Sequence, residues 1–247
     1  MRSESLKHLE TKSVWRAEWE HILLPYFPKD KLTLDCGCGP AYYKNFFGNN
    51  YIGIDVQRCF PNEGIYVRGS VVDLPFHEAS FEFVLASALL EHIENPNKAL
   101  SEICRVLKKK GNILLGAPSR YGAKYETLKT FRGYNIEDLE CLAHAQNLVV
   151  EKQFRIGGLF AIIFAEIENI LRRRLEIAKN GPQSFEGESY YHLFEHSPFG
   201  RVLLKLRSII LRLTVVADVN LPFKAFYQGA CIFATEQNTD EGSEDLK

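Results

Sequence analysis

The chain has 247 residues, 46% of them apolar, and a formal net charge of -1 at pH 7. Apolar content at this level can fill a core, which excludes disorder over most of the chain. The nearly balanced charge excludes an overall electrostatic field that would attract nucleic acid, so the composition favours a small-molecule partner.

The cysteines and the hydropathy pattern indicate the cellular compartment of the chain. Six cysteines are scattered without a C-x-x-C pair, and no secretory signal opens the sequence. A reducing, cytoplasmic setting is therefore expected. Nowhere does the sequence reach the run of about 18 uncharged apolar residues that a membrane-spanning helix needs.

The predicted elements begin with a helix over Val14–Tyr26, where Trp15 and Trp19 lie at helical spacing. Between residues 31 and 118, short apolar runs alternate with helical stretches, and these runs read LTLDC, YIGIDV, GIYVRGS, FEFVLAS and NILLGAP. The alternation predicts βαβ units and a doubly wound, mostly parallel sheet in an α/β fold. The crossover helix NPNKALSEICRVLKKKG is expected to end in a basic turn before Gly111.

The second half of the chain holds a further unit, an insertion and a final strand. A helix is predicted from Asn135 to about Gln146, and the strand LVVEKQF follows it. Residues from about 155 to 225 break the alternation with two apolar-basic helical stretches, and YQGACIFATE supplies a last strand at about 227–235. We therefore expect one domain over residues 1–236, with its ligand-binding core at about 30–155 and an acidic, disordered segment at 237–247.

The second stretch of this insertion is amphipathic and basic. Arg201, Lys205 and Arg212 lie on one side of the predicted helix, whereas Leu206 and Leu213 face away from them. Two interpretations remain open. The helices either rest on a membrane surface or a lipid-like substrate, or they form a helical cap or a homodimer interface.

The segment LTLDCGCGPAYY predicts the ligand site. Gly37 and Gly39 lie where the first strand turns into the first helix, and glycine there lets a ligand approach the backbone. Asp35 precedes them, and Asp55 ends the second strand, where a carboxylate can accept hydrogen bonds from both ribose hydroxyls. An acid before the loop favours a ligand with positive charge over a pyrophosphate, such as an amino acid joined to a sulfonium nucleoside.

In order, the segments LDCGCGPAYY, YIGIDV and GSVVDLPFHEASFEFVLASALLEHIENPNKALSEICRVLKKKGNILLGAP resemble the class I S-adenosylmethionine-dependent methyltransferases, specifically the methyltransferase type 11 domain family. The resemblance covers about Leu32–Pro118. It implies a Rossmann-like methyltransferase fold with seven strands, the last of them antiparallel. It also implies methyl transfer from S-adenosylmethionine to a small-molecule or lipid-linked acceptor, and we expect the acceptor atom to be oxygen.

The resemblance assigns roles to matching positions. The glycine loop and the acid before it correspond to the site of the methionine part of the cofactor, Asp55 to the ribose-binding acid, and GSVVDLPF to the segment beside adenine. The family usually has an acid where this chain has Ser70. The predicted cofactor-binding residues are Asp35, Gly37, Cys38, Gly39, Asp55, Val56, Ser70, Val71, Asp73, Leu74 and Ser87.

The block LEHI follows the fourth strand, in the region where the family places the methyl group. His92 in this block is the predicted catalytic base, and a purely structural role is the alternative. A base is needed only if the acceptor group must lose a proton. The predicted acceptor-binding residues are Arg120, Tyr121, Arg132, Tyr190, Tyr191 and His192.

Four competing interpretations have less support. Cys36 and Cys38 lack the further ligands of a tetrahedral metal site and are expected to pack beneath the loop. HLFEH, at His192–His196, matches the H-x-x-E-H pattern of zinc peptidases, but no further ligand follows, so no metal is predicted. A nicotinamide-dependent oxidoreductase would need a third glycine where this chain has Tyr42, and a non-catalytic, cofactor-binding partner subunit remains an alternative.

Overall fold

The computed structural model describes residues 14–57, 65–120, 122–125, 130–164 and 229–236, together with 166–167, 170 and single positions between 202 and 217. The chain divides into two compact units. One contains Met1–Pro25 and Ile156–Tyr227, and the other contains Tyr26–Arg155 and Gln228–Lys247. We refer to them as the helical unit and the sheet unit.

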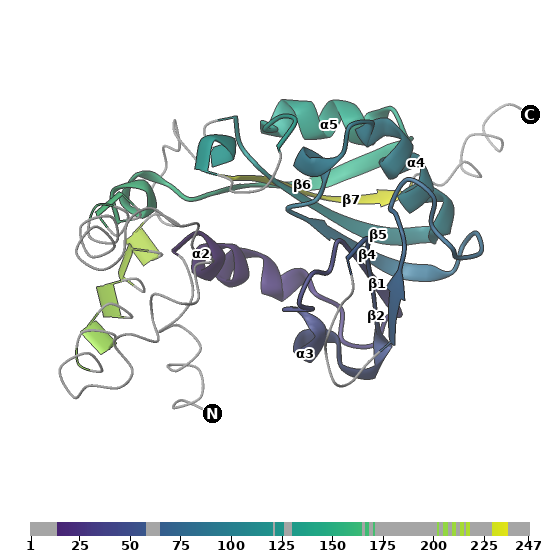
Figure 1. Ribbon diagram of the computed structural model, residues 1–247, viewed down its shortest axis with the longest axis horizontal. Coiled ribbons are helices and arrows are strands. Elements are labelled where there is room, and N and C mark those ends of the chain that lie inside the picture. The colour runs from purple at the N-terminus through teal and green to yellow at the C-terminus, as the bar shows by residue number, and fades with distance from the viewer. Residues whose placement is uncertain are drawn as a thin grey trace, which may run out of the picture. The chain divides into compact units, whose positions relative to one another are not determined.

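The sheet unit is built on a mixed sheet that confirms the predicted topology. Its strands are β1 (Thr33–Cys36), β2 (Tyr51–Asp55), β3 (Ile65–Arg68), β4 (Phe81–Ser87), β5 (Leu107–Pro118), β6 (Leu148–Ile156) and β7 (Gly229–Glu236). Within the described residues the strand order is β3-β2-β1-β4-β5-β7-β6 (Figure 1). The pairs from β3 through β5 are parallel, whereas β7 runs antiparallel to β5. The last strand therefore lies beside β6 and is antiparallel, as expected.

Helices cover both faces of this sheet. Figure 1 shows α4 (Pro96–Val106) and α5 (Ile136–His144) on one face and α3 (Lys44–Phe47) on the other. Asn95 caps the start of α4, because its side chain accepts a hydrogen bond from the Lys98 N–H at 3.1 Å. Helix α5 starts after Asn135, as predicted, and the Asp138 carboxylate accepts the Asn135 N–H at 2.8 Å. Short turns of 3-10 helix are η1 (Leu24–Tyr26), η2 (Gly48–Asn50), η3 (Leu90–His92) and η4 (Gly122–Tyr125).

The end of α4 differs from the prediction. The helix was expected to continue to Gly111, but it ends at Val106, and Leu107 begins β5. Leu107 is buried and pairs with Phe81 at the start of β4. Burial of this leucine in the sheet outweighs the favourable charge of a basic helix end, so the lysine run belongs to the strand.

Aromatic side chains fill the core beside β1, β2 and β4. Phe27 stacks on Phe47 with ring centroids 4.6 Å apart, and Phe47 stacks on Tyr51 at 6.1 Å. Phe83 lies 5.9 Å from Phe47, and all four rings are buried. This cluster fixes β1 between its neighbours, which positions the carboxyl ends of these strands.

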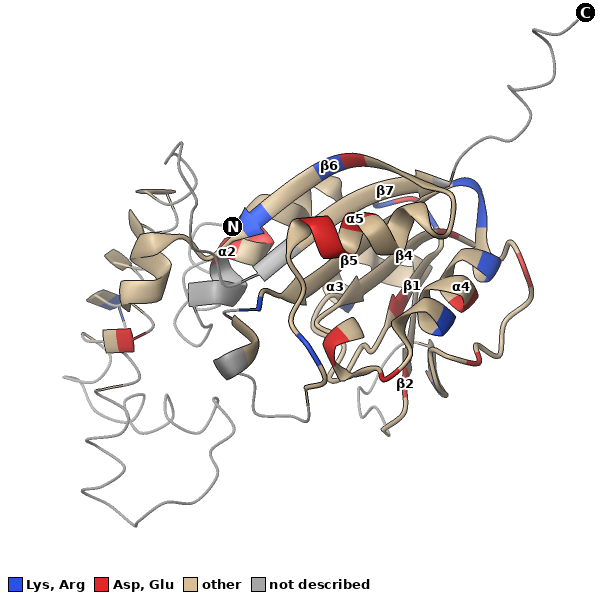
Figure 2. Ribbon diagram, turned by 90° about the horizontal axis from the view of Figure 1, so that it is seen from above, with Lys and Arg blue, Asp and Glu red and all other residues tan. Residues whose placement is uncertain are grey.

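Charged positions are spread over the outside of the sheet unit. Both acidic and basic residues occur along α4 and β6, whereas α5 carries Glu137, Asp138 and Glu140 and no lysine or arginine (Figure 2). This part of the surface has no continuous basic stripe along these three elements.

The helical unit contains α2 (Val14–Leu23), which confirms the predicted first helix, and its Trp19 and Leu23 are buried. The described positions from 159 to 170 and from 202 to 217 are also helical. The described part of the structure contains no helix that is both long and apolar enough to cross a bilayer.

Candidate functional site

The candidate site lies where β1 separates β2 from β4. Strand β1 pairs in parallel with both neighbours, so the chain leaves the carboxyl end of β1 at the point where the strand order reverses. Open α/β sheets bind ligands at such a switch point. Asp35, Asp55 and Ser87 all lie at this edge, at or near the ends of three adjacent strands.

The glycine loop after β1 is pinned to the end of β2. The N–H groups of Gly37 and Cys38 donate to the Ile54 carbonyl oxygen at 2.8 and 3.1 Å, and the Gly39 N–H donates to Asp55 Oδ2 at 3.0 Å. Gly37 has a φ of 72°, and a Cβ there would lie 2.9 Å from Leu89 Cδ1. Glycine at position 37 is therefore favoured by the positive φ of the backbone, and a Cβ there would also displace the Leu89 side chain.

Space for a ligand is present above the second glycine. Gly39 has a φ of 48°, and a Cβ built on it would meet no atom within 4 Å. The cradle therefore has an accessible backbone and a carboxylate, Asp55, at its rim. These features fit the amino-acid and ribose portions of a sulfonium nucleoside.

The two cysteines of the loop pack against the sheet. Cys36 is fully buried in β1, and burial raises the pKa of its thiol. Cys38 lies over Gly53 of β2, because a Cβ on that glycine would be 2.8 Å from the Cys38 Sγ. The thiols therefore fill space beneath the loop, which is the packing arrangement expected from the sequence.

Asp35 is only 3% exposed and accepts a hydrogen bond from the Tyr51 hydroxyl at 2.6 Å. Burial raises the pKa of Asp35 to about 7, although the bond from Tyr51 lowers it, and the nearby charge of Asp55 adds to the rise. Burial and the charge of Asp35 raise the pKa of Tyr51 as well. Near neutral pH the Asp35 carboxyl is thus poised between its two protonation states.

Asp55 has one backbone donor on each carboxylate oxygen. Oδ2 accepts the Gly39 N–H, and Oδ1 accepts the Gln57 N–H at 2.8 Å. Each oxygen of an ionised carboxylate can accept a second bond, so capacity remains for two ribose hydroxyls. The next residue, Val56, is 61% exposed, so it offers an apolar surface beside the same strand end.

The segment after β3 lies beside this acid. The Gly69 N–H donates to the Asp55 carbonyl oxygen at 3.0 Å, and Ser70 and Asp73 form a short bridge. Val71 and Leu74 are buried, whereas Asp73 is exposed. The predicted adenine segment is therefore next to the predicted ribose acid.

The block after β4 is tied to the segment that precedes α5. His92 is partly exposed, and its Nε2 lies 3.8 Å from the buried Glu91 Oε1. The Phe131 N–H donates to the Glu91 carbonyl oxygen at 2.8 Å, and the Tyr134 hydroxyl donates to the Leu90 carbonyl oxygen at 3.3 Å. These bonds fix the backbone that carries His92.

Two of the predicted acceptor-binding residues line one cavity of about 480 Å³ between α4 and α5. Arg120 pairs with Asp138 at 2.8 Å, and Arg132 donates to the Glu94 carbonyl oxygen at 3.0 Å. Tyr134 also lines this cavity. Tyr121, Tyr190, Tyr191 and His192 lie outside the described residues, as does the HLFEH segment.

Three contributors to the site could not be found from the sequence. Tyr51 donates to Asp35 only because the register places both on one face of adjacent strands. Gly53 makes room for Cys38, and Gly133 is needed because a Cβ there would lie 2.4 Å from the Ser119 carbonyl oxygen. Pairing register and backbone contacts of this kind leave no pattern in a single sequence.

Comparison with known proteins places this geometry in a family. The sequence profile of the family described as "Methyltransferase domain" matches residues 34–115. An uncharacterized protein of Methanocaldococcus jannaschii is 30% identical over 173 residues, which is 65% of this chain and 82% of that protein. A second protein of that organism, also uncharacterized, is 37% identical over 92 residues, 35% of this chain and 40% of its own length. An uncharacterized methyltransferase of Mycobacterium tuberculosis is 32% identical over 103 residues, 36% of this chain and 39% of that protein.

The chain thus spans less than half the length of two of these three relatives. Among solved structures, the 1,6-didemethyltoxoflavin-N1-methyltransferase of Burkholderia thailandensis, crystallised with 1,6-didemethyltoxoflavin and S-adenosylhomocysteine, has a TM-score of 0.51 at 14% identity and covers 91% of this chain and 79% of its own. The [4+2]-cyclase SpnF has a TM-score of 0.53 at 14% identity, with coverages of 89% and 80%. Such distant likeness shows the fold alone, and the two names describe different reactions. Sequence profile, relatives and strand order agree, and the chain belongs to the class I S-adenosylmethionine-dependent methyltransferases.

Proposed function

We propose that the chain transfers a methyl group from S-adenosylmethionine to an oxygen atom of a small-molecule or lipid-linked acceptor. The observation that carries the proposal is the cradle at the ends of β1 and β2, where Asp35 and Asp55 flank the open backbone at Gly39. Two neighbouring carboxylates favour a ligand with an ammonium group, a sulfonium and ribose hydroxyls, and they disfavour a pyrophosphate.

The residues of the cradle have separable tasks in this proposal. S-adenosylmethionine, when bound, supplies a methyl group already activated by positive sulfur. Asp55 would accept the ribose hydroxyls with its remaining lone pairs, and the positive-φ glycines would let the amino-acid portion approach the loop backbone. The chain then mainly aligns the reacting groups and excludes water.

His92 supports oxygen as the acceptor atom. Its imidazole can take the proton that a hydroxyl loses as the new O–CH3 bond forms, and the Glu91 carboxylate 3.8 Å away would stabilise the resulting imidazolium. The bond from the Phe131 N–H to the Glu91 carbonyl oxygen restrains the loop in which this pair lies.

The arginine-lined cavity supports an acceptor with an anionic group. Arg120 and Arg132 come from the two ends of the segment between β5 and α5 and line the same cavity as Asn97, at the start of α4. Arg120 is engaged by Asp138 through a single nitrogen, so other donors of its guanidinium remain for a carboxylate or a phosphate.

Titration calorimetry tests the cofactor. S-adenosylmethionine and S-adenosylhomocysteine should bind saturably, and NAD should not. Asp55→Asn removes a charged hydrogen-bond acceptor, and a hydrogen bond to a charged group contributes about 1.5–3 kcal/mol. The affinity for S-adenosylmethionine should therefore fall by about tenfold or more. Glu137→Gln, on the outside of α5, serves as the matched control and should bind as the unmodified chain does. Saturable binding of NAD alone would refute the proposal.

The acceptor atom is tested with S-adenosylmethionine that carries a ¹³C-methyl group. A panel of hydroxyl, amine and thiol acceptors, each with and without an acidic group, should yield a ¹³C-methyl signal at the chemical shift of an O-methyl group. His92→Gln should lower kcat and leave cofactor affinity unchanged. A non-catalytic partner subunit would instead bind the cofactor and turn over none of the panel.

A further inference from the structure

Helix α4 carries an ion pair on the side that faces the segment after β3. Glu102 and Arg105 are three residues apart, so their side chains meet on one face of the helix. Arg105 Nε lies 2.8 Å from Glu102 Oε1, and one Arg105 terminal nitrogen lies 2.8 Å from Glu102 Oε2. The bond from Arg105 holds the pKa of Glu102 at about 2, so the pair stays ionised at any ordinary pH.

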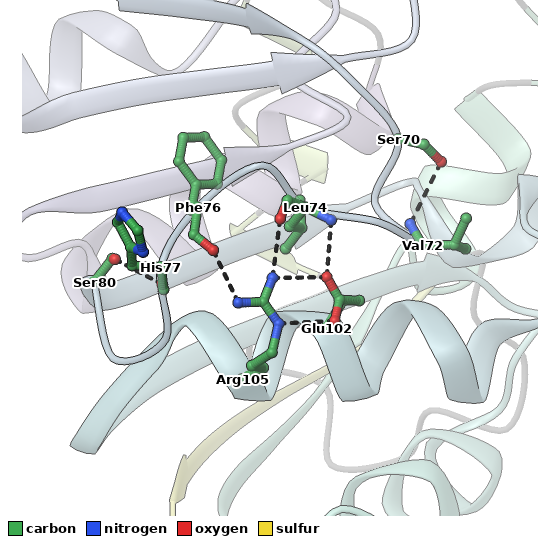
Figure 3. A network of polar contacts seen from close by, with 8 residues as sticks. All are labelled: Ser70, Val72, Leu74, Phe76, His77, Ser80, Glu102 and Arg105. Atoms are coloured by element: carbon green, nitrogen blue, oxygen red, sulfur yellow. Dashed lines mark hydrogen bonds and ion pairs between the residues drawn. The ribbon is translucent and has the colours of Figure 1, made fainter.

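This pair also binds the backbone of the predicted adenine segment (Figure 3). Glu102 Oε2 accepts the Leu74 N–H at 2.8 Å, and Arg105 donates to the carbonyl oxygens of Leu74 at 2.9 Å and Phe76 at 2.8 Å. Both backbone groups of Leu74 are therefore held by one ion pair. At its other end, the segment is held to β2 by the bond from Gly69 to the Asp55 carbonyl oxygen.

The position of the segment matters because its side chains offer little recognition of their own. Ser70 stands where the family usually has an acid, and its hydroxyl already accepts the Val72 N–H at 3.4 Å. Contacts with a purine would then come from the backbone near Val71 and from the side of Leu74. Such contacts depend on where the backbone lies more than on which side chains it carries.

We propose that Glu102 and Arg105 are positioning residues, which hold residues 70–76 in the place where the segment recognises the adenine of the cofactor. The inference rests on the proposed use of S-adenosylmethionine. Neither residue would touch the cofactor. Their contribution reaches it through the backbone at Leu74 and Phe76.

The contribution of this pair to binding is separable from its contribution to stability. The side chains of Arg105 and Glu102 are 36% and 20% exposed, so solvent screens the pair and limits its contribution to the stability of the fold. Helix α4 is anchored by its apolar face, where Ala99, Leu100, Ile103 and Val106 are buried. Breaking the pair should therefore release the segment and leave the helix in place.

The test compares cofactor affinity, base discrimination and thermal stability. Arg105→Lys keeps the charge but cannot bond Glu102, Leu74 and Phe76 together, and Glu102→Gln keeps the shape but removes the charge. Each substitution should lower the affinity for S-adenosylhomocysteine by about tenfold. Each should also reduce the preference for S-adenosylhomocysteine over S-inosylhomocysteine, which has oxygen in place of the adenine amino group. The KM for S-adenosylmethionine should rise at unchanged kcat.

Arg155→Gln is the matched control, because Arg155 pairs with Glu137 at 3.9 Å away from this segment. It should leave affinity, discrimination and Tm as they are. A lower Tm in the Arg105 and Glu102 variants with unchanged affinity and discrimination would overturn the inference and leave the proposed function intact. Absence of any S-adenosylhomocysteine binding by the unmodified chain would instead overturn the proposed function, and this inference with it.

Discussion

Asp35 is a buried acid whose ionisation works against folding. The unfolded chain loses the Asp35 proton near the ordinary pKa of 3.8, but the folded chain keeps it until about pH 7. Between these values the folded state binds more protons than the unfolded state, so the free energy of unfolding falls as the pH rises. Above about pH 7 Asp35 is ionised in both states, and the free energy of unfolding falls no further on its account. A cationic ligand beside Asp35 would restore part of the stability that is lost.

Substitution of Asp35 by asparagine isolates this effect. Asp35→Asn keeps an oxygen that can accept the Tyr51 hydroxyl but has no proton to lose. In the unmodified chain, Asp35 should lower the free energy of unfolding by about 1.4 kcal/mol per pH unit between about pH 4 and 7, and the variant should lack this decrease. The free energy of unfolding of the variant, relative to that of the unmodified chain, should therefore rise with pH and level off above about pH 7. Urea unfolding at several pH values measures this difference, and parallel stability curves would contradict it.

At the scale of elements, the glycine loop packs closely on β2 where Cys38 lies over Gly53. A Cβ on Gly53 would meet the Sγ of Cys38 at 2.8 Å, the Cβ of Cys38 at 3.1 Å and Tyr66 Cδ1 at 3.0 Å. Strand and loop are therefore complementary at this point, with a glycine under a cysteine. The contact involves the residue that precedes Ile54, and Ile54 and Asp55 accept the hydrogen bonds that pin the loop.

A double-mutant cycle tests this contact. Gly53→Ala should lower the free energy of unfolding by about 1–3 kcal/mol through overpacking. Cys38→Ala alone should cost about 1 kcal/mol and leave S-adenosylhomocysteine affinity within a few-fold, because the thiol fills space only. The double variant should recover part of the Gly53→Ala loss, since the closest atom is gone while Cys38 Cβ remains. Strictly additive losses would show that the contact is not the cause.

The elements were predictable to different degrees for physical reasons. Strands and crossover helices leave apolar runs and periodic faces in the sequence, so β1, β2 and β4 were expected where they occur. The residue at which α4 ends was not predictable, because a basic run is compatible with a helix end and with a strand edge. Only the burial of Leu107 against Phe81 decides that this run belongs to β5. The pair of Glu102 and Arg105 was missed because it binds backbone groups about 30 residues away.

Likewise, the places of Gly37, Gly39 and Asp55 at the ends of β1 and β2 were predictable, because a switch point imposes residue types on strand ends. The ionisation of Asp35 was not, since it follows from burial and from the register that brings Tyr51 beside it. A sequence therefore predicts a position where backbone geometry restricts the residue type. It does not predict a property, such as the pKa of Asp35, that depends on how side chains pack.

For the whole molecule, the helical unit presents apolar side chains to solvent. The described large apolar residues at helical spacing are Leu159, Phe160, Ile163, Ile167, Ile170, Val202, Leu206, Ile209, Ile210, Leu213 and Val216, each between 42% and 66% exposed. Lys205 is exposed among them, and the sequence from 200 to 216 contains four basic residues and no acidic ones. We propose that this surface rests on an anionic membrane, where a lipid-linked acceptor would be found.

Vesicle flotation tests this surface. The chain should float with vesicles that contain phosphatidylglycerol and less with pure phosphatidylcholine, and Leu206→Glu with Ile209→Glu should reduce flotation several-fold. Val149→Glu on β6 changes a residue that is 46% exposed in the sheet unit and should have no effect. Failure to float, together with a dimer in analytical ultracentrifugation, would show instead that the surface joins two copies.

The position of β7 in the sheet has a consequence for synthesis on the ribosome. Strand β7 lies between β5 and β6, yet it follows the end of β5 by about 110 residues. At roughly 5–20 residues per second, a nascent chain waits roughly 5–20 s between completing β5 and receiving its partner. Throughout that interval Ile113, Leu114 and Leu115 border an open sheet edge. Translation that stalls before Gly229 thus leaves an unclosed, aggregation-prone intermediate, however well the preceding strands have folded.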